Sequence, residues 1–221
     1  SPSASKGGPR NYSNAFLPSI HQGTALGRAG NVSGAKIKNI DNAMLSDAQR
    51  ENRYDLLQNL NRFQAGSSGD DNLEATIANY ELAWRMQMEA PELTDLSKET
   101  AATKSIYGID EKYTDDFGKQ CLLARRMVER GVRFVSVNYS DESANPRWDQ
   151  HGNMPKHADH ARATDKPVAG LLQDLKMRGL LEDTLVWWGG EFGRTPFSQN
   201  NDGRDHNPRG FTVFLAGGGV K

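Results

Sequence analysis

The first half of the chain contains two segments with apolar residues at helical spacing. Ser46 and Gln49 form a Ser-x-x-Gln pair, a signature of a helix N-terminus, and apolar residues recur after it as far as Phe63. After a polar, glycine-containing break, a second helix with a broad apolar stripe is predicted over about residues 71–90, and Pro91 is expected to end it. We therefore predict an antiparallel pair of helices.

Two more helices are predicted before the middle of the chain. A short one covers residues 97–107, and a longer one runs from Asp115 to Arg130, where Gly131 ends it. Cys121 lies on the apolar face of the longer helix, which predicts an inert, buried thiol rather than a nucleophile. Residues 1–45 are rich in Gly, Ser, Asn and Pro and lack periodicity, so they are predicted to be an extended, irregular segment.

The second half alternates between strand and helix patterns. Residues 132–138, 183–188 and 211–216 are predicted strands, and a helix is predicted from about His157 to Arg178. Strand, helix and strand at this spacing indicate a βαβ unit, so we expect an α/β fold with a parallel sheet covered by helices. The predicted organisation is an extended segment, a helical region and a βαβ region, at residues 1–45, 46–130 and 131–221.

Composition excludes several classes of protein. With 28 acidic and 27 basic residues the net charge is -1, which argues against a nucleic-acid partner because phosphate binding needs a basic excess. The single cysteine excludes an internal disulfide framework and a cysteine-only metal site. No apolar run is long enough to predict a transmembrane segment. The mean hydropathy of -0.72 indicates either a very polar surface or a large share of loop.

The loops after the predicted strands hold most of the candidate metal ligands. Asp149 and His151 lie two residues apart, so in an extended segment they project to the same side. A carboxylate and an imidazole are common partners in zinc, manganese or iron sites. The alternative is an ordinary loop aspartate beside a solvent-exposed histidine.

Two further clusters occupy the long loop between the last two predicted strands. Glu191 follows a strand of bulky apolar residues, where a charge needs a partner or a metal. Arg194 could bind an anion or simply pair with Glu191. Asp205 and His206 offer another carboxylate and imidazole, and Arg204 and Arg209 flank them as candidate anion-binding residues. Because ligands bind at the carboxyl ends of parallel strands, these clusters are predicted to converge.

The sequence does not decide the role of two other histidines. His157 and His160 lie three residues apart at the start of a predicted helix, and they are either groups that support the site or surface residues. The sequence contains no phosphate-binding P-loop, no Gly-x-Ser-x-Gly elbow and no His-Glu-x-x-His motif.

Several motifs together resemble the DUF1501 family, taken here as a branch of the alkaline phosphatase and sulfatase superfamily. The resemblance rests on Gly131-Val-Arg-Phe-Val, Trp148-Asp-Gln-His-Gly-Asn, Gly190-Glu-Phe-Gly-Arg-Thr-Pro and Gly203-Arg-Asp-His-Asn-Pro-Arg-Gly-Phe. It implies part of an alkaline phosphatase-like parallel-sheet sandwich, with an inserted or leading helical pair and a two-metal site for ester hydrolysis.

The resemblance also implies roles for individual residues. Asp149, His151 and His206 are similar to the ligands of one cation, and Glu191 to a ligand of a second, where Phe192 replaces a histidine. Asp205 could compensate for that loss. The cations would be divalent, with zinc, manganese and calcium as candidates, and Arg194, Arg204 and Arg209 would hold the anion.

The expected function is hydrolysis of phosphate or sulfate esters of a small molecule or glycan. No residue of this chain matches the nucleophile of the superfamily, which is expected upstream of Ser1. We therefore predict that this chain is a C-terminal portion that is inactive alone. The alternatives are a non-catalytic relative that binds anionic glycans and a structural module. Family resemblance also implies export.

Overall fold

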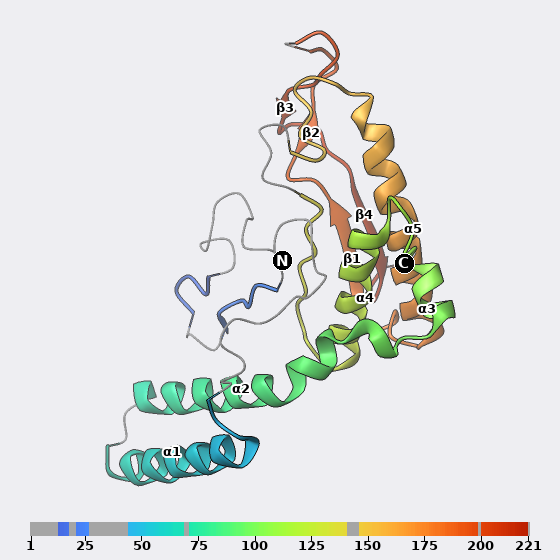
Figure 1. Ribbon diagram of the computed structural model, residues 1–221. Helices are drawn as coiled ribbons and strands as arrows, with labels where there is room; N and C mark the ends of the chain where they lie inside the picture. The colour runs from blue at the N-terminus through green and yellow to red at the C-terminus, as the bar shows by residue number, and fades with distance from the viewer. Residues whose placement is uncertain are drawn as a thin grey trace.

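The structure is a computed structural model that describes residues 13–17, 21–26, 44–68, 71–140, 146–198 and 200–220. It is a mixed α/β protein, as predicted, with long helices and two small sheets (Figure 1). Most of the predicted extended segment, residues 1–45, lies outside the described ranges. Within the described part of the chain, no helix is both long and apolar enough to span a membrane.

The predicted helical pair is confirmed as α1 (Asp47–Ser68) and α2 (Asp71–Thr94). The capping box at the start of α1 forms in both directions, because Ser46 N–H donates to Gln49 Oε1 at 2.9 Å and Gln49 N–H donates to Ser46 Oγ at 3.3 Å. The rings of Tyr54 and Trp84 stack between the helices, with centroids 4.7 Å apart. In Figure 1 this pair lies apart from the strands.

The predicted end of α2 at Pro91 is wrong, since the helix continues to Thr94. A proline in a helix removes one backbone hydrogen bond but keeps a helical φ, so one further turn is tolerated. The Thr94 hydroxyl donates to the carbonyl of Ala90 at 3.0 Å, which adds a side-chain bond in this last turn.

The main core lies where α3 (Ala101–Ile106), α4 (Asp115–Glu129) and α5 (Lys156–Met177) meet, just after a short 3-10 turn, η3 (Leu96–Lys98). Its buried members are Tyr107, Ile109, Phe117, Cys121 and Leu122. Burial raises the pKa of the Cys121 thiol, which agrees with the predicted inert cysteine. Gly131 and Gly179 follow α4 and α5 with φ of 81° and 70°, the conformation that ends helices at glycine.

The strands differ from the prediction in their direction. β1 (Leu185–Gly189) pairs with β4 (Val213–Gly217), and β2 (Gly193–Arg194) pairs with β3 (His206–Asn207); both pairs are antiparallel. The loop between β1 and β4 folds back on itself through β2 and β3, so the chain reverses without the crossover that parallel pairing requires. The predicted parallel sheet is therefore not what these strands form.

The segment predicted as the first strand, residues 132–138, is not a strand in the structure. Alternating apolar and polar residues favour an extended backbone, but a strand also needs hydrogen bonds from a neighbouring strand. Among the described residues, the two strand pairs do not include this segment.

Candidate metal centre

The first part of the site is the loop that leads into α5. Asp149 N–H donates to the carbonyl of Pro146 at 2.9 Å, which closes a turn, and Trp148 has a φ of 70°. This left-handed backbone is rare for a bulky residue. The turn brings the Oδ1 atom of Asp149 within 3.2 Å of His151 Nε2. The prediction that these two side chains project to the same side is therefore confirmed.

The second part of the site is the short ladder of β2 and β3. Arg194 and His206 are direct cross-strand partners, and such pairs present their side chains on the same face. Both side chains reach the same atom: Arg194 donates to Asp149 Oδ1 at 2.7 Å, and His206 Nε2 lies 3.1 Å from it. A two-residue ladder thus fixes the approach of both groups to one carboxylate.

Close backbone contacts hold the two parts together. Met154 N–H donates to the carbonyl of Asp202 at 3.0 Å, and Arg204 N–H donates to that of Gln150 at 2.9 Å. Gly203 lies directly against the His151–Gly152 peptide, so closely that a Cβ atom there would collide with the His151 carbonyl. The backbone that carries His151 is therefore fixed by the loop that carries His206.

Three potential ligand atoms form a nearly regular triangle. Asp149 Oδ1, His151 Nε2 and His206 Nε2 lie 3.1 to 3.2 Å from one another. Donors bound at about 2.1 Å to one ion are separated by roughly 2.9 to 3.4 Å in octahedral or tetrahedral geometry. The donor set and its spacing are therefore compatible with a single metal ion.

Asp205 contacts His151 from the other side of the imidazole ring. Its Oδ1 lies 3.0 Å from His151 Nδ1, and its side chain is only 14% exposed. A proton on Nδ1 that is donated to this carboxylate leaves a lone pair on Nε2, the arrangement typical of metal-bound histidine. The Nε2 lone pair then faces a carboxylate oxygen of Asp149, and two such atoms need a cation or a proton between them.

The Asp149 carboxylate is held in its charged form. Partial burial opposes ionisation, but hydrogen bonds from Arg194 and His206, together with the Arg194 charge, outweigh it and lower the pKa of Asp149. Its charge is therefore available to a cation at neutral pH.

The other predicted site residues lie around this cluster rather than in it. Glu191 lines a neighbouring pocket, but its carboxylate is not in the three-residue cluster found among the described residues. The Arg204 guanidinium donates to the carbonyl of Gly203 at 2.7 Å, and the Arg209 side chain is exposed. Only Arg194 of the three predicted anion-binding arginines contacts a candidate ligand. The Phe192 ring packs on His206, with centroids 4.4 Å apart.

His157 and His160, whose role the sequence did not decide, lie beside the site. His160 is buried, with Nδ1 3.3 Å from the Tyr139 hydroxyl. His157 packs against the Trp148 ring at 5.1 Å, and burial, aided by the Arg194 charge, lowers its pKa. Both therefore support the loop that carries Asp149, instead of lying on a free surface.

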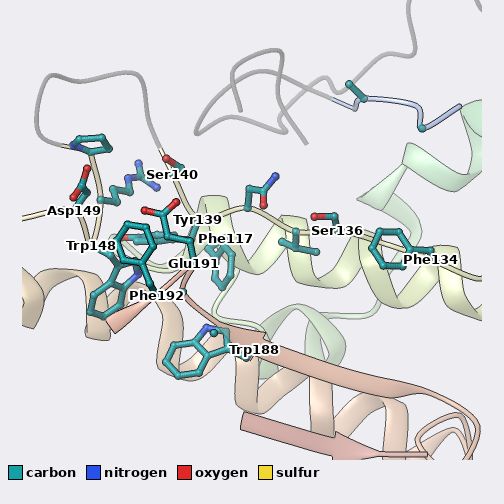
Figure 2. Close-up of a pocket in the computed structure, with 18 of the residues that line it drawn as sticks. Phe117, Phe134, Ser136, Tyr139, Ser140, Trp148, Asp149, Trp188, Glu191 and Phe192 are labelled. Carbon is teal, nitrogen blue, oxygen red and sulfur yellow. The ribbon is translucent and has the colours of Figure 1, made fainter. Parts of the chain in front are cut away.

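A pocket of about 960 Å³ adjoins the cluster; Asp149 belongs to both, and Arg194, which donates to Asp149, also lines the pocket. Its aromatic lining was not predicted as functional: Phe117, Phe134, Tyr139, Trp148, Trp188 and Phe192. Figure 2 shows Trp148, Trp188 and Phe192 toward the end that holds Asp149 and Glu191, with Phe134 toward the opposite end. The sequence held one signal that could have predicted this lining: aromatic residues stand next to candidate ligands, such as Trp148 beside Asp149.

Fold and site together define a mixed α/β protein with a candidate cation centre of two histidines and one carboxylate. Over residues 1–221 the chain matches the family described as "Protein of unknown function (DUF1501)", and it belongs to that family. Comparison with curated proteins and with solved structures found no match.

Proposed function

We propose that this chain binds one divalent cation through Asp149, His151 and His206 and serves in the hydrolysis of phosphate or sulfate esters. The observation that carries the proposal is the triangle of donor atoms, 3.1 to 3.2 Å apart, with Asp205 behind His151. The proposal includes the finer assignment to an alkaline phosphatase-like and sulfatase-like fold, and export from the cell, both by family resemblance.

The donor chemistry narrows the choice of cation. Two imidazoles and one carboxylate suit zinc or manganese, whereas calcium prefers a shell made of oxygen atoms. Of the three cations expected from the sequence, zinc and manganese are therefore the better candidates. One cluster within the described residues supports one cation rather than two.

Each residue has a role in this proposal. A divalent cation, when bound, supplies Lewis acidity for ester hydrolysis. Asp205 accepts the Nδ1 proton of His151 and so keeps the Nε2 lone pair directed at the site. Arg194 is only 23% exposed and holds the Asp149 carboxylate; its remaining guanidinium donors suit an ester oxyanion. Phe192 packs on the His206 ring and limits its rotation.

The nucleophile is proposed to come from a segment upstream of Ser1, as the family resemblance implies. The hydrolytic test therefore needs the natural protein with whatever precedes this residue. The cation-binding test needs only the present chain.

A second candidate function is supported by Phe192. Where the superfamily resemblance implies a histidine for a second cation, this phenylalanine packs on His206 instead. A protein with one cation and no second could bind anionic glycans without cleaving them. Cation binding with no hydrolysis of any ester would favour this function.

The first experiment is calorimetric titration of the chain with zinc and with manganese. We expect one cation per chain for the unaltered protein and a loss of at least about 100-fold in affinity for His206→Ala and Asp149→Asn. Glu191→Gln is the matched control, because this carboxylate lines the pocket outside the cluster, and its affinity should stay within about twofold. Equal losses in all three variants would contradict the assigned ligands.

The second experiment measures turnover of aryl phosphate and sulfate esters by the natural protein. We expect cation-dependent hydrolysis that His206→Ala abolishes. A cation-loaded protein that cleaves no ester in a broad panel would rule out the hydrolase and leave glycan binding.

A further inference from the structure

The pocket beside the cation cluster joins charged and aromatic groups in one cavity. Asp149 belongs to both the cluster and the pocket, and Arg194, which also lines the pocket, donates to the Asp149 carboxylate, so the pocket opens beside the cation site. The volume of about 960 Å³ lies at the upper end of the range for small-molecule sites. The cavity therefore has room for an organic group attached to an anionic ester.

Two adjacent tryptophans on β1 differ in their relation to the pocket. Trp187 and Trp188 are 59% and 48% exposed, and they point to opposite faces of the strand because side chains alternate. Of these two tryptophans, Trp188 lines the pocket and Trp187 does not. In Figure 2 the Trp188 indole lies beside β1, below Phe192 and Glu191. An exposed indole at that place offers a flat apolar face to a ligand.

The pocket also presents polar groups between its aromatic walls. Ser136 and Glu191 are exposed side chains in its lining, and Asn138 lines it two residues after Ser136. Arg147 lies over the Tyr139 ring, 4.7 Å from its centroid, which adds positive charge at the rim. A plain aromatic group would cover the exposed Ser136 and Glu191 side chains without offering them a hydrogen bond.

We propose that this pocket is a subsite for a sugar ring that carries the anionic ester, with Trp188 as its stacking platform. A sugar presents apolar C–H faces to aromatic rings and hydroxyl groups at its edge, which matches Trp188 together with Ser136, Asn138 and Glu191. The assignment rests on the proposed function, because the cation site and Arg194 receive the ester group.

The test compares three probes by titration calorimetry on the zinc-loaded chain: glucose 6-phosphate, phenyl phosphate and inorganic phosphate. We expect glucose 6-phosphate to bind more tightly than both others. Trp188→Leu should weaken it by about tenfold, at the lower end of the loss measured when a ring stacked on a nucleobase is removed, and leave inorganic phosphate unchanged. Trp187→Leu, the neighbouring change on the opposite face, should alter neither.

Several results would overturn the subsite. Equal effects of the two tryptophan variants would do so, as would tighter binding of phenyl phosphate than of glucose 6-phosphate, or no advantage of the sugar ester over inorganic phosphate. Failure of the proposed function is separate: in that case Asp149→Asn leaves zinc binding unchanged. Trp188-dependent binding of glucose 6-phosphate that survives a chelator would support the subsite and reject the cation.

Discussion

Two regions of this protein gather charged residues, and they differ in what the charges do. Where α4 and α5 meet the end of η3, Arg125, Arg126 and Arg178 pair with Glu99, Glu129 and Asp174. Three positive groups meet three negative ones. Arg125 and Asp174 are 2% and 3% exposed, and the Tyr107 hydroxyl donates to Asp174 at 2.9 Å. Burial and the adjacent Asp174 raise the pKa of Tyr107.

The cation cluster is arranged differently. Asp149, His151 and His206 are 29%, 40% and 43% exposed, and their possible ligand atoms lie 3.1 to 3.2 Å from one another. Buried side-chain atoms without a hydrogen-bond partner occur in both regions: one oxygen of Asp205 in the loops, and the Nε atoms of Arg125 and Arg126 between the helices. In the helical network each carboxylate pairs with two arginines, whereas the loop cluster gathers two imidazoles and one carboxylate at one place. Paired buried charges indicate a structural role, and a partly exposed group of possible ligand atoms indicates a ligand.

The largest expected effect separates these two roles. Arg125→Met removes the buried cation that faces Glu99, Glu129 and Asp174, so two arginines remain for three carboxylates and one negative charge is uncompensated. We expect the free energy of unfolding to fall by about 3 to 5 kcal/mol, measured by urea denaturation. Lys166→Met is the control, because Lys166 and Glu111 pair at 42% and 50% exposure and should contribute under about 1 kcal/mol. Similar losses of unfolding free energy in the two variants would show that the buried network contributes no more to stability than an exposed ion pair.

The next prediction concerns the glycine that joins the two loops of the site. Gly203→Ala would force the His151 carbonyl to move, because a Cβ atom has no space there. We expect zinc affinity to fall by roughly 10- to 100-fold, since small displacements of a ligand weaken metal binding strongly. Gly152→Ala is the matched control: no atom lies within 4 Å of a Cβ at that position. The two variants should differ in calorimetric titration, and equal affinities would show that His151 is not fixed by this contact.

Sequence reasoning found the helices and the donors but not the arrangement of the strands. The capping box at Ser46 and the glycines after α4 and α5 are local signals, so these helix boundaries were predictable, whereas the end of α2 beyond Pro91 was not. The direction of β4 relative to β1 depends on how the loop between them folds, and no local sequence pattern predicts that fold. For the site, likewise, the ligand residue types could be read from the sequence. Only the β2–β3 register shows that Arg194 and His206 meet at Asp149.

The role of Asp205 changed for a similar reason. Its sequence position beside His206 suggested a direct ligand, yet its carboxylate contacts His151 Nδ1 instead. Asp205→Asn keeps the shape and an acceptor oxygen but removes the charge. We expect zinc affinity to fall by about tenfold with little loss of stability. Asp202→Asn removes a charge three residues earlier, where Oδ1 accepts from Asn153 N–H at 2.7 Å, and should change affinity by less than about twofold.

The smallest predicted effect tests whether charges on the helical side act through stability alone. Partial burial of Asp115 opposes its ionisation, but hydrogen bonds from Lys119 and from the Asp110 N–H prevail and lower its pKa. A carboxyl with a lowered pKa stabilises the folded state above its unfolded pKa, and that contribution disappears as the pH falls through the folded value. Because Asp115 and Lys119 are partly exposed, Asp115→Asn should cost under about 1 kcal/mol at pH 7 and nothing once the carboxyl is protonated. Urea denaturation at several pH values measures this, and Lys119→Met should remove part of the same pH dependence. Zinc affinity should not change in either variant, and a change would mean that the helical charges and the cation cluster are coupled.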